Sequence, residues 1–221
     1  MTKQTRQRAI RIDHTTKFIA DTHFGHVLMI SKDRQQDGVV QPQLRTFDSI
    51  REHDDALIDA WNDSVKPSDT IYHLGDFGWW RAPVEDLERI FKKLNGKKVL
   101  VPGNHDSIEV ARFGWHEVIP GVVHWLDTDK TKIVGSHHPQ REWDGWHSGA
   151  VHFHGHTHAS LPSCRRSMDI GVDSIGRWPL SATDIRAYMS SLPELDFRGV
   201  ATIDFVPDRG DEDEQALAKT P

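Results

Sequence analysis

The chain has 221 residues, of which 37% are hydrophobic and 27% are charged, and its formal net charge is −6. This composition predicts one water-soluble domain, and the negative charge disfavours tight non-specific binding to nucleic acid, which depends on clustered Lys and Arg. No window approaches the roughly 18 apolar residues of a membrane span, and the N-terminus lacks an apolar signal core, so we expect a cytoplasmic protein. The single cysteine, Cys164, excludes an internal disulfide and a cluster of thiolate ligands.

Seven short apolar runs bounded by turn residues predict β-strands. In chain order the runs are 17–20, 70–74, 97–101, 122–126, 131–135, 150–153 and 168–172. Three further segments have the spacing of amphipathic helices and begin after Ser49, Pro83 and Ser181. Ser49 and Ser181 each precede an acidic residue by three positions, which is the pattern of a capping box.

The alternation of strands and helices predicts an α/β fold with largely buried sheets. We expect a single domain over residues 1–206, followed by an acidic, disordered tail over residues 207–221. The composition leaves the oligomeric state open.

Five segments rich in His and Asp follow predicted strands. They are DTHFGH (21–26), HLGDFG (73–78), PGNHD (102–106), GSHHP (135–139) and HGHTH (154–158). In open α/β sheets, ligands bind in the loops beyond the carboxyl ends of the strands, because a rigid scaffold holds these loops. The five segments therefore predict one site built from distant parts of the chain.

The residue types and their spacing predict a site for two metal ions. Residues two apart project to the same side, as do Asp21 and His23, whereas an isolated carboxylate such as Asp76 can bridge two cations. The predicted ligands are Asp21, His23, Asp76, Asn104, His137, His156 and His158. Seven ligands that share one carboxylate fill four positions on each ion and leave room for water and substrate. Because the set is rich in imidazole and lacks thiolate, we expect Mn first, with Fe, Zn, Ni or Co as alternatives, over Ca or Mg.

In their order from Asp21 to His158, the motifs DTH, GD, GNHD and GHTH resemble those of the calcineurin-like metallophosphoesterase superfamily. The resemblance implies a four-layer type of sandwich, in which two mixed β-sheets are flanked by helices and the metal site lies at the carboxyl ends of the strands. It implies that Asp21, His23, Asp76 and His158 bind one ion, and that Asp76, Asn104, His137 and His156 bind the other. It also implies that His105 is the catalytic histidine.

These assignments predict hydrolysis of phosphate esters. A hydroxide that bridges the ions would attack phosphorus in line, and His105 would donate a proton to the leaving oxygen. Protein serine/threonine phosphatases of this superfamily read GDxxDR where this chain reads GDFGWW, so the arginine that clamps a phosphomonoester is missing unless Arg81 or Arg141 replaces it. We therefore expect a phosphodiesterase that acts on small nucleotides. A phosphomonoesterase, a nuclease and a non-catalytic scaffold are the alternatives.

Several other residues near the motifs have two interpretations each. His26 could contact a substrate phosphate or lie on a helix surface. Asp106 could steady His105 or bond to local backbone amides. The loop tryptophans, which are Trp79, Trp80, Trp143 and Trp146, could stack a nucleobase or cover the underside of a loop.

The remaining tryptophans and two further histidines have structural interpretations. Trp61, Trp125 and Trp178 are expected to pack in the core. His138 and His154 lie beside ligands at the wrong parity, which favours packing or support of the ligands.

Overall fold

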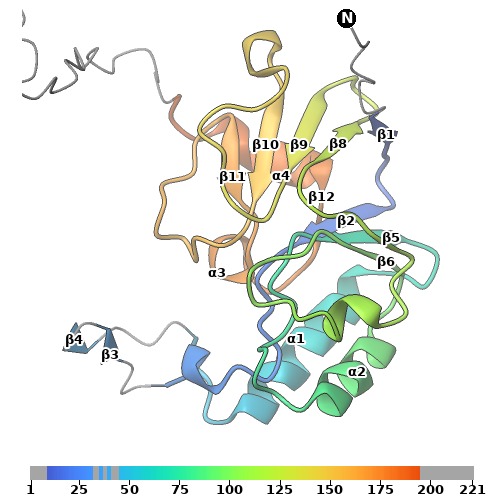
Figure 1. Ribbon diagram of the computed structural model, residues 1–221. Coiled ribbons are helices and arrows are strands. Elements are labelled where there is room, and N and C mark those ends of the chain that lie inside the picture. The colour runs from blue at the N-terminus through green and yellow to red at the C-terminus, as the bar shows by residue number, and fades with distance from the viewer. Residues whose placement is uncertain (1–8, 32–34, 37–38, 41–44, 195–221) are drawn as a thin grey trace, which may run out of the picture.

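Two five-stranded β-sheets form the centre of the protein (Figure 1). The computed structural model describes residues 9–31, 35–36, 39–40 and 45–194. The first sheet has the order β1 (Ile10–Arg11), β8 (Val123–Leu126), β9 (Lys132–Gly135), β10 (Val151–His154) and β11 (Ser167–Asp169). The second has the order β12 (Leu180–Ser181), β2 (Thr16–Ile19), β5 (Thr70–His73), β6 (Lys97–Leu100) and β7 (Glu117–Val118). A separate two-stranded sheet contains β3 (Gln35–Gln36) and β4 (Val39–Val40).

Both large sheets are mixed. Strands β8 and β9 are antiparallel in the first sheet, as are β12 and β2 in the second, whereas the other neighbouring strands are parallel. Aromatic side chains from both sheets form the core between them, because alternate residues of each strand face inward. The Phe18 ring lies 5.1 Å from the Trp125 ring and 5.6 Å from the Phe153 ring. This contact holds the two sheets face to face.

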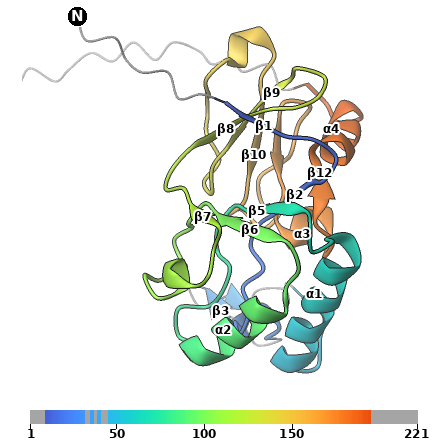
Figure 2. The ribbon, with the colours of Figure 1, turned by 90° about the vertical axis from the view of Figure 1, so that its right-hand side faces the viewer.

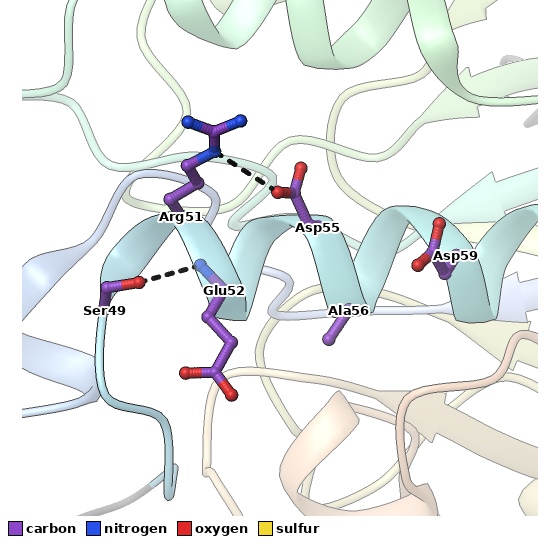
Figure 3. Close-up of a pocket in the computed structure, with 6 residues that line it drawn as sticks. All are labelled: Ser49, Arg51, Glu52, Asp55, Ala56 and Asp59. Atoms are coloured by element: carbon purple, nitrogen blue, oxygen red, sulfur yellow. Dashed lines mark hydrogen bonds and ion pairs between the residues drawn. The ribbon is translucent and has the colours of Figure 1, made fainter.

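Helices α1 (Ile50–Ser64) and α2 (Val84–Lys93) cover the outer face of the second sheet, as Figure 2 shows. The Ser49 hydroxyl caps α1 by accepting the Glu52 N–H at 3.1 Å (Figure 3). The Glu52 carboxylate accepts the Asp48 N–H at 2.9 Å, so it bonds one residue before the position that a capping box predicts. Arg51 pairs with Asp55 on the solvent side of the same helix (Figure 3).

The other helices are short or lie after the last sheet strands. They are α3 (Val172–Ile175), α4 (Ala182–Ser190) and the 3₁₀ helices η1 (Val27–Met29), η2 (Val110–Arg112) and η3 (Trp146–Ser148). The predicted capping box of α4 is complete, since Ser181 and Asp184 bond to each other's backbone N–H. The segment that carries Trp143 packs against Val134 on the outer face of the first sheet.

Most predicted elements are observed within one or two residues of their predicted ends. The run 168–172 is an exception, because the strand ends at Asp169, whose carboxylate accepts the Gly171 N–H at 2.7 Å and turns the chain into α3. Strands β1, β7 and β12 were not predicted, since two residues are too few to show a period.

Tertiary packing determines which of the tryptophans that were expected in the core are buried there. Trp61 and Trp125 are fully buried, as predicted, but Trp178 is 46% exposed and lies beside the Arg177 guanidinium. The predicted domain boundary at residue 206 and the acidic segment 207–221 lie outside the described residues. Within the described residues, no helix is long and apolar enough to cross a membrane.

Candidate metal centre

The strands that precede the five motifs end next to one another. Pairing places Ile19, His73 and Leu100 side by side in the second sheet, and Gly135 beside Phe153 in the first. The loops that follow these strands therefore start at the same level in each sheet. The His156 N–H bonds to the Asp21 carboxylate at 2.9 Å and so joins the loops of the two sheets.

Two glycines allow these loops to approach closely. Gly75 has a φ of +91°, and a Cβ there would lie 2.6 Å from His137 Nδ1 and 2.5 Å from Gly103 N. A Cβ at Gly103 would lie 2.7 Å from Asp76 N. Neither position has room for a side chain.

Asp21, His23, His158 and one oxygen of Asp76 form a first group. Ligand atoms of Asp21, His23 and His158 all lie within 4.8 Å of one another. His23 Nε2 lies 3.4 Å from Asp76 Oδ2. Asp21 and His23 are almost completely buried, so their charge and lone pair face the protein interior.

The other oxygen of Asp76 faces a second group. His137 Nε2 lies 3.4 Å from Asp76 Oδ1. Asn104 Oδ1 lies 3.0 Å from His137 Nε2 and 2.9 Å from His156 Nδ1. The two groups adjoin, because Asp21, Asp76 and His137 also offer ligand atoms within 4.8 Å of one another.

The spacing of these atoms fits metal coordination. Metal–ligand bonds of about 2.0 to 2.2 Å, at angles between octahedral and tetrahedral values, place neighbouring ligand atoms about 2.8 to 3.6 Å apart. The four distances between candidate ligand atoms range from 2.9 to 3.4 Å. Divalent cations are therefore compatible with both groups.

The hydrogen bonds of three histidines leave one ring nitrogen free to bind a metal. His137 Nδ1–H donates to the Leu74 carbonyl at 2.8 Å, and His158 Nδ1–H donates to Asp173 at 2.7 Å, so in the neutral form of each ring Nε2 carries the lone pair that a metal would bind. His23 Nε2 is buried and has no hydrogen-bond partner among the described residues. A buried lone pair without a donor is costly unless a cation fills the space.

Backbone strain is concentrated at the same residues. Five of the seven non-glycine residues with positive φ in the described part of the chain are candidate ligands. They are Asp21 (57°), His23 (49°), Asp76 (58°), His156 (72°) and His158 (46°). Each left-handed residue costs about 1 to 3 kcal/mol, and such strain clusters at functional sites because surrounding contacts enforce it.

Comparison with known proteins identifies the family. A family model described as calcineurin-like phosphoesterase matches residues 14–129, which is more than half of the chain. The chain belongs to this family. It is therefore a metal-dependent phosphoesterase, an enzyme that hydrolyses phosphate esters with the help of divalent metal ions.

Individual relatives of this phosphoesterase are distant but similar in length. An uncharacterized protein of Methanocaldococcus jannaschii is 26% identical over 174 residues, with 74% of this chain and 84% of that protein covered. The gene 66 protein of Mycobacterium phage L5 is 25% identical over 197 residues, with 73% and 88% covered. A solved structure of a protein of unknown function from Aquifex aeolicus is 23% identical, with a TM-score of 0.58 over 78% of this chain and 98% of that one. It shows that the fold is shared.

Without cations, burial makes a negative charge on Asp21 unfavourable, whereas Asp76 and His137 stabilise each other's charge. Burial raises the pKa of Asp21 to about 7. Burial alone would lower the pKa of His137, but its hydrogen bond with Asp76 raises it to about 8. Burial also lowers the pKa of His23 well below its usual value, so this ring is neutral and offers a lone pair. Cations placed here would offset the buried carboxylates.

His105, the predicted catalytic histidine, lies at the edge of the centre. Its ring centroid is 5.0 Å from that of His23 and 5.6 Å from that of His26. Its backbone N–H donates to Asp76 Oδ1 at 2.8 Å, which ties it to the carboxylate between the two groups. Its Nδ1 is buried and has no hydrogen-bond partner among the described residues.

Asp106 bonds to backbone amides, which was one of its two predicted roles. Its carboxylate accepts the N–H groups of Asp76 and Phe77 at 2.8 Å each and of Gly103 at 2.9 Å. Burial raises its pKa to about 6. Asp106 therefore joins the loop of Asp76 to the loop of Asn104, and no hydrogen bond links it to the side chain of His105.

His26 is buried beside His23 and does not lie on a helix surface. Its Nδ1 lies 3.2 Å from His23 Nδ1, and its ring stacks on Trp79 with centroids 4.9 Å apart. Trp79 is half-buried, so part of this stacked pair reaches the surface near His105.

Trp143 is buried beneath its loop, which is the second of the two interpretations that the sequence left open. Trp143 is 5% exposed, its Nε1–H donates to the Ala150 carbonyl at 2.9 Å, and its ring stacks on His152. The Trp143 ring therefore packs against the first sheet and is not accessible for stacking on a nucleobase.

Arg81 and Arg141, which could replace the missing clamp, lie on the surface of the described structure. The Arg81 guanidinium lies 4.4 Å from the centroid of the exposed Trp80 ring, and Arg141 is exposed. Neither arginine makes a hydrogen bond or ion pair with a candidate ligand within the described residues.

His154 has the structural role that its parity predicted, whereas His138 offers a ring nitrogen within 4.8 Å of ring nitrogens of His137 and His156 and could also bind a metal, which sequence reasoning missed. The exposed His138 ring packs 4.2 Å from the His156 ring. His154 is buried, and its Nδ1–H donates to the Gly155 carbonyl at 2.9 Å.

Sequence reasoning missed a buried ion pair beside the centre. Arg45 and Asp173 lie 2.9 Å apart, and Asp173 is the partner of His158. The two residues are 128 positions apart, so no spacing or motif connects them.

Proposed function

We propose that the phosphoesterase binds two transition-metal ions that share Asp76. One ion is held by Asp21, His23, Asp76 and His158, and the other by Asp76, Asn104, His137 and His156. The observation that carries this proposal is the orientation of Asp76, whose Oδ2 faces His23 and whose Oδ1 faces His137. Mn is the first candidate, with Fe, Zn, Ni and Co as alternatives, because the ligands are mainly imidazoles without thiolate.

The proposed reaction is in-line attack of hydroxide on phosphorus. When bound, two such ions lower the pKa of a water molecule and neutralise charge on the phosphoryl oxygens. His105, as an imidazolium, donates a proton to the leaving oxygen. Its position at the edge of the centre, with its backbone bonded to Asp76, supports this role.

We further propose that the substrates are phosphodiesters of small nucleotides. A diester carries one negative charge less than a monoester dianion, so it depends less on the arginine clamp that this chain lacks. The stacked pair of His26 and Trp79 offers an aromatic surface near His105 for a base. The net charge of −6 argues against long nucleic acids as substrates. A phosphomonoesterase and a nuclease are the competing possibilities.

Two measurements on the Mn-loaded protein test the proposal. Elemental analysis should find two ions per folded chain, and a value near one or zero would refute the shared site. The ratio kcat/KM should be higher for an aryl diester than for the matched monoester, and cyclic nucleotides and dinucleotides should be cleaved faster than single-stranded nucleic acids. Preference for the monoester would support the phosphatase alternative.

A further inference from the structure

A buried arginine lies behind the metal centre, in the segment that precedes α1. Arg45 is 6% exposed, which is unusual for arginine unless its charge is paired. Its Nε and Nη2 donate to the two oxygens of Asp173 at 2.9 Å each. Nη2 also donates to the Asp21 carbonyl at 2.5 Å, and Nη1 donates to the Thr22 carbonyl at 2.7 Å and to His53 Nε2 at 2.8 Å. These bonds use the five N–H donors of a guanidinium.

One side of this network leads to His158. Asp173 lies on α3, beside the segment that follows β2 (Figure 1). Its Oδ2 accepts a hydrogen bond from Arg45 and another from His158 Nδ1–H at 2.7 Å. The paired carboxylate therefore fixes both the tautomer of His158 and the direction of its Nε2.

The other side leads to Asp21. The Asp21 backbone is left-handed, with a φ of 57°, and such strain persists only when surrounding contacts enforce it. Arg45 donates to the backbone carbonyls of Asp21 and Thr22, which belong to the two peptide groups that follow this strained position. The network also reaches the end of the same loop, because His53 Nδ1–H donates to Asp54, which accepts the Gly25 N–H.

We propose that Arg45 is a positioning residue of the metal centre, which aligns His158 through Asp173 and Asp21 through its backbone so that both ligands meet the same ion. The inference rests on the proposed assignment of these two ligands to one ion. Only a planar guanidinium can bond to two carboxylate oxygens and two carbonyls at once. Because Asp21 and His158 are assigned to the same ion, loss of Arg45 should weaken the binding of that ion and not of the other.

The test is titration of metal-free protein with Mn²⁺ by isothermal calorimetry. Arg45→Met and Asp173→Asn should each raise the dissociation constant of one ion by about 10- to 100-fold. The dissociation constant of the other ion should stay within about twofold of the wild-type value. Arg45→Lys keeps the charge but loses the fork, so it should lie between wild type and Arg45→Met. Arg186→Met is the control, because Arg186 pairs with Asp127, which follows β8 next to the start of β9, whereas the ligand His137 follows the end of β9. Thermal melting of each metal-free variant checks that it is folded.

The outcomes separate this inference from the proposed function. If wild type binds two ions and both dissociation constants are unchanged in Arg45→Met and in Asp173→Asn, Arg45 has no positioning role and the dinuclear site stands. The variants could instead weaken the binding of both ions equally, in proportion to their loss of Tm. If Arg186→Met reproduces this relation between binding and Tm, the role of Arg45 is only structural. If wild type itself does not bind two ions, the proposed function fails, and the inference fails with it.

Discussion

Replacing the buried carboxylate of Asp21 should have opposite effects on the metal-free and metal-loaded protein. Burial raises the pKa of Asp21 from 3.8 to about 7. Because the folded-state pKa is raised, ionisation opposes folding: the cost is absent below about pH 4 and complete above about pH 7. A shift of about three pKa units corresponds to about 4 kcal/mol. Asp21→Asn removes this cost and keeps an oxygen that can accept the His156 N–H.

Urea unfolding in the presence of a chelator, at pH values from 5 to 8, measures this cost. Relative to wild type, Asp21→Asn should gain stability progressively as the pH rises, by up to about 4 kcal/mol at pH 8. With saturating Mn²⁺ the order should reverse, since wild type gains binding free energy that the variant loses. Asp59→Asn, on the exposed face of α1, is the control for loss of one surface carboxylate (Figure 3).

The result that refutes this reasoning is specific. If metal-free Asp21→Asn is less stable than wild type at pH 8, the Asp21 carboxylate is stabilised by its surroundings without a cation. If metal-loaded wild type has no advantage over the variant, Asp21 is not a ligand.

Three other substitutions test separate parts of the site and core. His105→Asn should lower kcat by a factor of about 10² to 10⁴ and leave the metal content unchanged. Esters with acidic leaving groups should recover part of the lost activity, because they need no proton from His105. Loss of metal in this variant would instead make His105 a ligand. Burial lowers the pKa of His152 to about 4, so its stabilising effect is present above about pH 6.5 and is lost as the pH falls toward 4. His152→Gln should therefore reduce the acid sensitivity of unfolding by up to about 3 kcal/mol, and an unchanged pH profile would contradict this. Trp79→Ala should raise KM for nucleotide diesters more than for a methyl aryl diester; an equal change for both would remove the base-stacking role.

Local patterns in the sequence were sufficient to predict seven of the strands and the candidate ligands that follow them. Each of the five motifs follows an apolar run, and a run of four or five residues is long enough to show that a strand ends there. Asp21 and Asp76 could therefore be placed at strand ends without knowledge of the fold. The caps of α1 and α4 were also visible, because Ser49 and Ser181 act on residues only three positions away.

Other features depend on residues that are distant in the chain, and only the tertiary structure decided them. Trp143 and Trp178 have similar sequence surroundings, rich in polar residues, yet one is 5% and the other 46% exposed, because only Trp143 has a sheet face to cover. Asp and His tolerate a left-handed backbone better than most residues, but contacts between loops of both sheets, such as the bond from the His156 N–H to Asp21, decide where the candidate ligands adopt it. The ion pair between Arg45 and Asp173 was likewise decided by the tertiary structure. The two residues are 128 positions apart, so no local pattern in the sequence indicates that they pair. The sequence thus determined which groups follow the strands, and the packing of the two sheets decided which of them meet and what holds them in place.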